Sequence, residues 1–123
     1  IRRCEIENIS DSQMILDIGS KTTQMISQYI NKSKLILWNG PLGAFEYPSF
    51  AESSIKIANI IKSRSVNSEI ISIAGGGDTN SVIKIAKAKD GFSYISNAGG
   101  AFLEWLEGNG SPGFNAIEEN NIN

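Results

Sequence analysis

Short apolar runs alternate along the chain with longer stretches of helical periodicity. Runs rich in β-branched or aromatic residues lie at positions 14–18, 35–38, 70–74 and 92–96, and they predict β-strands. Apolar side chains recur at helical spacing at positions 26, 29 and 30, at 51, 55, 58 and 61, at 82, 83 and 86, and at 101, 102, 105 and 106. Because each strand is followed by a helix, the order predicts parallel strands joined by right-handed crossovers.

We therefore predict an α/β fold with a Rossmann-like parallel sheet and helices on both faces. The run at 70–74 is nearly all apolar, which is typical of a central strand buried on both sides. Asp90-Gly91 is expected to lead from a helix into a strand rather than to form a hairpin. After Gly108 the sequence is rich in Gly, Asn, Ser, Pro and Glu, so we expect one domain at 1–108 and a mobile tail at 109–123.

Composition narrows the class of protein. A formal net charge of -2 argues against a nucleic-acid or anionic-membrane partner, because both attract basic faces. Histidine is absent and Cys4 is the single cysteine, which removes the commonest general base, the Ser/His and Cys/His dyads, and any internal disulfide. No apolar run approaches the roughly 18 residues of a membrane helix, so we expect a soluble, cytoplasmic protein.

Glycine and polar residues gather where the predicted strands end. They form four loops, at residues 17–22, 38–43, 75–79 and 96–100. Ligands of open parallel sheets bind beyond the carboxyl ends of the strands. The four loops therefore predict one shared ligand site.

The loop at 75–79 reads Gly75-Gly76-Gly77-Asp78-Thr79. Three glycines let the backbone approach a ligand closely, and the helix that follows offers free N–H groups and a positive dipole end to a phosphate. Thr79 could add a hydroxyl donor, and Asp78 could act through Mg²⁺. The alternative is an ordinary turn in which Asp78 or Thr79 is an N-cap with no ligand. The pattern is neither GxGxxG nor GxxxxGK[ST], which argues against a nicotinamide-dependent oxidoreductase.

Two further loops have a functional and a structural interpretation. The amides of Gly99 and Gly100 could face a phosphoryl group in transfer, or the two glycines could serve close packing between a strand and a helix. Glu46 could accept hydrogen bonds from ribose hydroxyls, or it could complement the dipole of the next helix. Trp38 and Phe45 are interpreted as packing residues.

These motifs resemble one known family. Residues 38–46 (WNGPLGAFE), 75–79 (GGGDT), 96–101 (SNAGGA) and 103–108 (LEWLEG) resemble the closing third of phosphoglycerate kinase, and 17–22 (DIGSKT) resembles another of its motifs in the same order. The similarity runs from about residue 14 to residue 112. It implies part of the carboxyl-terminal, nucleotide-binding domain of a two-domain, monomeric enzyme. That enzyme transfers phosphoryl reversibly between ATP and 3-phosphoglycerate, giving 1,3-bisphosphoglycerate in glycolysis.

The resemblance also implies a role for individual residues. Glu46 would hold the ribose, Asp78 would interact with the Mg²⁺ shell, and the Gly99 and Gly100 amides would face the transferred group as the catalytic element. The nucleotide, as Mg-ATP or Mg-ADP, would be bound by Asn39, Gly40, Glu46, Gly75, Gly76, Gly77, Asp78 and Thr79.

The chain departs from the family pattern in two places. The family usually has Thr-Gly where this chain has Asn97-Ala98. If that backbone needs a positive φ, Ala98 costs about 1 kcal/mol. Ser111 stands where an apolar residue is common, which affects docking of the tail.

The resemblance finally implies that the active site is incomplete. Phosphoryl transfer requires positioning and cationic charge, and Lys21 is the only cation in the four loops. The family's acceptor site lies in its amino-terminal domain, so 3-phosphoglycerate is expected to bind only when that domain is supplied. Arg2, Arg3 and Arg64 are interpreted as surface charge. We expect a fragment that is inactive alone and prone to self-association; the alternative is a non-catalytic remnant or interaction module that keeps the loops.

Overall fold

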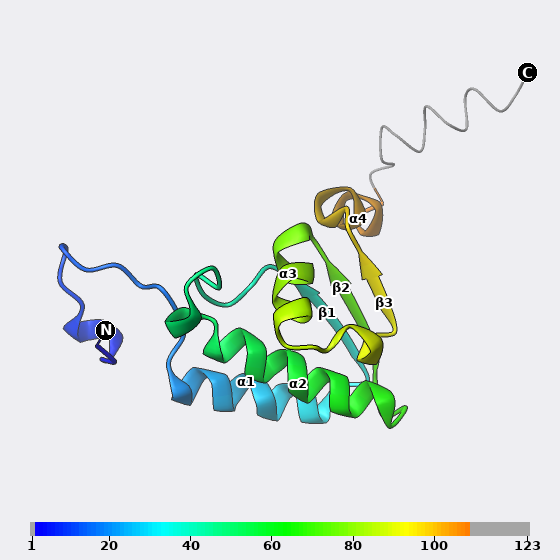
Figure 1. The fold of residues 1–123 in the computed structure, drawn as a ribbon, viewed down its shortest axis with the longest axis horizontal. Helices are drawn as coiled ribbons and strands as arrows, with labels where there is room; N and C mark the ends of the chain where they lie inside the picture. The colour runs from blue at the N-terminus through cyan, green and yellow to red at the C-terminus, as the bar shows by residue number, and fades with distance from the viewer. Residues whose placement is uncertain (1, 109–123) are drawn as a thin grey trace, which may run out of the picture.

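The computed structural model describes residues 2–108. Predictions about the tail, including Ser111, lie outside these residues. Figure 1 shows helices packed beside a parallel sheet. With η for a 3-10 helix, the elements are η1 (Ile6–Asn8), α1 (Ser20–Lys32), β1 (Leu35–Asn39), η2 (Pro48–Phe50), α2 (Glu52–Val66), β2 (Ile71–Gly75), α3 (Gly77–Ile85), η3 (Lys89–Gly91), β3 (Tyr94–Ser96) and α4 (Gly99–Leu106).

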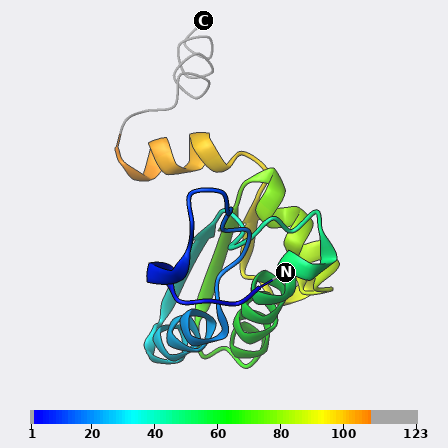
Figure 2. The same ribbon diagram turned by 90° about the vertical axis from the view of Figure 1, so that its left-hand side faces the viewer.

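The sheet confirms the predicted α/β class. Its strands are parallel in the order β1-β2-β3, so β2 is central as expected. The register places Leu37 beside Ile73, and Ile73 beside Tyr94. Two successive right-handed crossovers in the same direction put both crossover helices on one face of a sheet. Accordingly, α2 and α3 pack together on one side of the strands (Figure 2).

The core lies between this covered face and the helices. Trp38 of β1 and Ala74 of β2 point into it, and they meet Ile61 of α2 and Val82 of α3. The Trp38 ring also lies 6.3 Å, centroid to centroid, from that of Phe92. The helical periodicity therefore predicted the buried positions 58, 61, 82 and 83 correctly, but Ile55 is only half-buried and the buried Ile57 was not predicted.

The opposite face of the sheet carries exposed apolar side chains. Leu35, Leu37 and Ile71 are 59%, 43% and 58% exposed, and Tyr94 is 56% exposed. These four residues form what we call the open face. The prediction that the central strand is buried on both sides is therefore wrong for Ile71, and α1, α2 and α3 supply no second layer. The physical reason is the strand order, which sends both crossovers to the same side.

The predicted first strand, at residues 14–18, does not form. Met14 and Ile15 are 79% and 66% exposed, and the segment has no assigned strand. Its backbone contact with the rest of the fold is a hydrogen bond from the Ala44 N–H to the Leu16 carbonyl, 2.8 Å long. A β-branched run becomes a strand only beside a partner strand, and this run has none within the described residues.

Arg64 is not the surface charge that the sequence predicted. Its side chain is only 15% exposed, because Nε donates to Glu69 at 2.9 Å and Nη1 donates to the Ile30 carbonyl at the end of α1. The last carbonyls of a helix lack intrahelical partners and favour a cation. Arg64 therefore joins α2 to α1. Arg3 is exposed as expected, in an ion pair with Glu52.

Candidate functional site

The loops that follow the three strands meet at one place. A Cβ added to Gly99 would lie 2.7 Å from both the Cα and the N of Gly76, and 2.8 Å from Asn39 Oδ1. Gly76 in turn donates its N–H to the Ser96 carbonyl at 3.2 Å. Asn39 ends β1, whereas Gly76 follows β2 and Gly99 follows β3, so the predicted convergence of the strand ends is confirmed. Glycine is needed at 99 because two backbones touch there.

A buried hydroxyl links the first two of these loops. The Gly40 N–H donates to Thr79 Oγ1 at 2.7 Å, while the Trp38 indole N–H donates to the Gly40 carbonyl at 2.6 Å. Thr79 is 1% exposed, so its side chain serves the contact between loops. Its direct contact with a phosphate stays a prediction.

The beginning of α3 has no side-chain cap. Its N-cap is Gly76, at φ 97° and ψ 146°, a conformation that favours glycine, and no side chain bonds to the cap. The alternative interpretation of Asp78 or Thr79 as an N-cap is therefore wrong. The first intrahelical bond runs from the Asn80 N–H to the Gly76 carbonyl at 3.0 Å. The N–H groups of Gly77 and Asp78 thus lack intrahelical partners, and both residues are exposed.

The beginning of α4 lies beside that of α3. Gly99 is buried, whereas Gly100 is exposed and a Cβ there would meet no atom within 4 Å. Ala98 donates its N–H to Ser96 Oγ at 3.2 Å. Among the described residues other than glycine, only Ser68 and Lys87 have a positive φ. The condition for strain at Ala98, a positive φ, is therefore not met.

Glu46 is an exposed residue of the otherwise half-buried connection between β1 and η2. The next α-helix, α2, begins at Glu52, and Glu52 itself is the acidic residue of its first turn. Phe45 beside it packs against the core cluster. With the burial of Trp38, this confirms that both aromatic residues serve packing.

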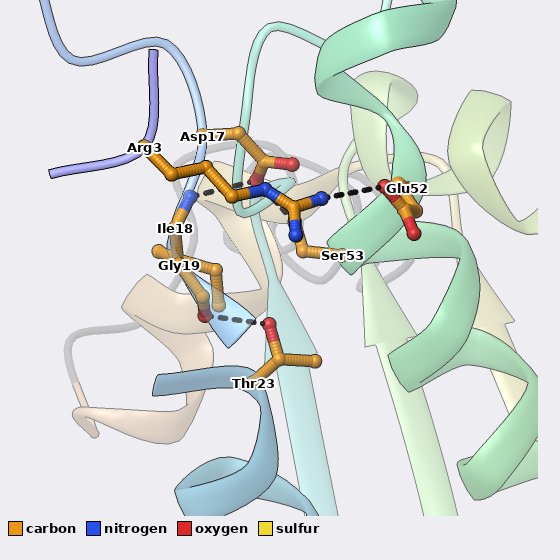
Figure 3. Close-up of polar contacts among 7 residues, drawn as sticks. All are labelled: Arg3, Asp17, Ile18, Gly19, Thr23, Glu52 and Ser53. Atoms are coloured by element: carbon orange, nitrogen blue, oxygen red, sulfur yellow. Dashed lines mark hydrogen bonds and ion pairs between the residues drawn. The ribbon is translucent and has the colours of Figure 1, made fainter. Parts of the chain in front are cut away.

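The fourth loop, at residues 17–22, braces the connection after β1. Figure 3 shows Asp17 accepting hydrogen bonds from the Ile18 N–H, at 2.8 Å, and from the Ser53 hydroxyl of α2. A Cβ on Gly43 would lie 2.5 Å from both Asp17 Oδ1 and the Phe50 carbonyl. Asp17 thus packs against the loop that carries Glu46. The sequence did not predict the hydrogen bond from Ser53 to Asp17, because residues 36 positions apart show no spacing that indicates a contact.

The fourth loop carries the cation Lys21 and lines a cavity, and none of residues 75–79 or 96–100 lines that cavity. Lys21 is 84% exposed and pairs with Glu5 at 2.5 Å; the hydrogen bond with Glu5, and then its negative charge, raise the pKa of Lys21 above its ordinary value. A cavity of about 480 Å³ is lined by residues 2–4, by residues 13–20 and by the start of α2. Between residues 2 and 108, no group of three or more acidic or cysteine side chains could hold a metal, and no helix is long and apolar enough to span a membrane.

A protein-family model for phosphoglycerate kinase matches residues 1–109. This chain belongs to the phosphoglycerate kinase family. It is 40% identical over 115 residues to the phosphoglycerate kinase of Chelativorans sp. (strain BNC1), covering 94% of this chain and 29% of that protein. It is 46% identical over 121 residues to that of Buchnera aphidicola subsp. Schizaphis graminum, covering 96% and 30%.

A solved structure of phosphoglycerate kinase, from Coxiella burnetii, has the same fold as this chain. The TM-score is 0.77 at 35% sequence identity, over 85% of this chain and 26% of that one. The resemblance seen in the four loops is therefore confirmed, as is the open parallel sheet. The chain spans less than a third of the length of the relatives it matches.

Proposed function

We propose that this chain supplies part of the Mg-nucleotide site of a phosphoglycerate kinase. The whole enzyme transfers phosphoryl reversibly between ATP and 3-phosphoglycerate, giving 1,3-bisphosphoglycerate in glycolysis. The observation that carries the proposal is the meeting of Asn39, Gly76 and Gly99 at the carboxyl end of the sheet, where ligands of open parallel sheets bind.

The start of α3 is suited to the phosphates of the nucleotide. The N–H groups of Gly77 and Asp78 lack intrahelical partners and lie at the positive end of the helix dipole. Anions bind at such helix ends. Gly75 and Gly76 lead the chain into this turn, and no side chain caps it.

The neighbouring loops complete the proposed cradle. The Gly99 and Gly100 amides, at the start of α4, would face the transferred phosphoryl group, whose negative charge spreads over three oxygens. Asn39 and Gly40 would line the pocket of the nucleotide. Glu46 would accept hydrogen bonds from its ribose, a role that its exposed carboxylate permits.

Asp78 is the proposed contact with Mg²⁺. Its carboxylate is exposed on the first turn of α3, and a hard oxygen donor is the ligand type that Mg²⁺ prefers. A single carboxylate fits this metal, since Mg²⁺ usually keeps several waters and takes its other ligands from phosphates. When bound, the ion neutralises charge on the nucleotide phosphates.

The chain alone does not supply all that the reaction requires. Lys21, the only cation in the four loops, is paired with Glu5, and the acceptor 3-phosphoglycerate would bind on the amino-terminal domain of the enzyme. The apolar open face of the sheet also favours a covering partner. We therefore propose no turnover by these 123 residues alone. From the family resemblance we propose that the whole enzyme is cytoplasmic and monomeric.

Calorimetric titration of the 123-residue chain with Mg-ADP tests the nucleotide site. D78N is expected to weaken binding about tenfold, because it removes a charged ligand partner. D90N is the matched control: it makes the same charge change in η3, which leads into the start of β3 rather than following the end of a strand. Without Mg²⁺, D78N should bind ADP at least as tightly as the wild-type chain, because the Asp78 carboxylate then only repels the phosphates. Absence of Mg-ADP binding by the folded wild-type chain would refute the nucleotide site.

Turnover is tested by adding the missing portion. The part of the Buchnera aphidicola relative that this chain does not match, which we propose to be its amino-terminal part, is mixed with the chain and assayed for formation of 1,3-bisphosphoglycerate. Turnover from the mixture and from neither part alone is the expected result. A folded mixture that binds Mg-ADP without turnover would instead indicate a remnant or an interaction module.

A further inference from the structure

Asn80 connects the two glycine loops through its side chain. It stands in the first turn of α3, where its own N–H bonds to the Gly76 carbonyl. Its Nδ2 donates to the Ser96 carbonyl at 3.2 Å and to Asn97 Oδ1 at 2.7 Å. The acceptors are the last residue of β3 and the first residue of the turn that leads to α4. The amide therefore clasps that turn to the beginning of α3.

The orientation of this amide is fixed by its surroundings. If it were rotated, Asn80 Oδ1 would face the Ser96 carbonyl oxygen, which can only accept, and that hydrogen bond would be lost. In the observed orientation Oδ1 is buried and has no partner among the described residues, although buried polar atoms normally have one. Burying Oδ1 without a partner costs free energy. This cost is the reason to look for a role of the two hydrogen bonds that Nδ2 donates.

The clasp acts locally. The Ser96 carbonyl also accepts the Gly76 N–H at 3.2 Å, so that backbone contact would remain without Asn80. What Asn80 adds is a hold on residue 97, two positions before the buried contact of Gly99 with Gly76. Removing it should loosen the turn without separating β2 from β3.

We propose that Asn80 is a positioning residue, with Asn97 as its partner. Together they fix the amides of Gly99 and Gly100 relative to those of Gly77 and Asp78. The inference rests on the proposed function, in which the first pair faces the transferred phosphoryl group and the second pair faces the rest of the nucleotide. In such a site the distance between the two pairs sets the alignment of the reacting groups, to which rate is sensitive.

The first test measures mobility in the full 123-residue chain, by ¹⁵N relaxation order parameters of the Gly99 and Gly100 amides. The wild-type chain should give values near 0.85, the level of a rigid backbone, and N80L should give values below about 0.6. N80L is close in shape and removes the unpaired oxygen together with the donors. Its urea unfolding midpoint should therefore stay within error of the wild-type value. A purely structural role predicts the opposite: lower stability with an unchanged turn.

Asn97 provides the matched pair of variants. N97D keeps an acceptor for Asn80 and should retain the rigid turn, whereas N97A should loosen it as N80L does. In the complemented enzyme, N80L should lower kcat about tenfold, the equivalent of one hydrogen bond, with KM for ATP changed less than twofold.

The outcomes separate this inference from the proposed function. A turn that stays rigid in N80L, or N97D behaving like N97A, overturns the positioning role even if Mg-ADP binds. A wild-type chain that fails to bind Mg-ADP refutes the nucleotide site, while the order parameters still decide whether the clasp holds the turn. If kcat and KM of N80L both match the wild-type values in the complemented enzyme, the catalytic consequence of the clasp is refuted.

Discussion

G99A tests the close contact on which the proposed site depends. Gly99 is buried where the turn after β3 meets the turn after β2. An alanine Cβ would stand 2.7 Å from the Cα and N of Gly76, and 2.8 Å from Asn39 Oδ1. Two of these three atoms are backbone, so rotation of a side chain cannot relieve the overlap. The two loops must move apart.

The size of the effect follows from the cost of overpacking. Extra carbon in a closely packed site typically costs about 1–3 kcal/mol, and we expect G99A to lower the free energy of unfolding by that amount. G100A is the matched control, since a Cβ at Gly100 meets no atom within 4 Å. Any gain in helix propensity, at most about 1 kcal/mol, is common to both variants because both residues begin α4. The difference between the free energies of unfolding of G99A and G100A therefore measures the cost of the overlap at residue 99.

Urea unfolding followed by circular dichroism measures this difference, provided that both variants keep the wild-type dependence on denaturant. Calorimetry then measures the effect on nucleotide binding. G99A should weaken Mg-ADP binding, because displacing Gly76 also displaces the amides at the start of α3 that follow it. Equal stability of G99A and G100A would contradict the contact itself. Lower stability with unchanged nucleotide binding would refute the link between the contact and the site.

Three further substitutions test other features of the structure. G43A should destabilise the chain by about 1–3 kcal/mol in urea unfolding, because its Cβ would lie 2.5 Å from Asp17 Oδ1; a neutral result would rule out this packing. The raised pKa of Lys21 means that its pairing with Glu5 persists below the ordinary value of 10.5 and is lost as pH rises through the raised one. E5Q should lower the Lys21 pKa in an NMR titration, and an unchanged pKa would contradict the pairing. L35K, on the open face, should reduce self-association in sedimentation experiments; unchanged association would place the sticky surface elsewhere.

The sequence predicted the parts of the fold that depend on local pattern. The alternation of apolar runs and helical periodicity gave β1, β2 and β3 and the helices between them, because strand and helix periods differ. The convergence of the loops was also predictable, since the carboxyl ends of parallel strands share one edge. Asn39 and Gly99 are 60 residues apart, yet strand direction alone places them together.

The errors come from contacts that periodicity does not encode. Residues 14–18 have the composition of a strand but no neighbour to pair with, and pairing is decided by tertiary structure. Arg64 was interpreted as surface charge because the carbonyl it bonds, at Ile30, belongs to a different helix. Asn80 was missed for the same reason, since its acceptors lie 16 and 17 residues further along. The spacing of residues along the sequence does not reveal which side chains from different elements will contact one another.

The strand order explains which groups of the proposed site these residues bring together. Three strands in chain order send both crossovers to one face and bring three loops to one edge. Backbone amides for phosphates are a local product of those loops, because each helix start supplies its own. These loops do not supply cationic charge in the same way, because their one cation, Lys21 on α1, is paired with Glu5. We therefore expect nucleotide affinity to reside in these residues, and rate to depend on what covers the open face and brings the missing cations.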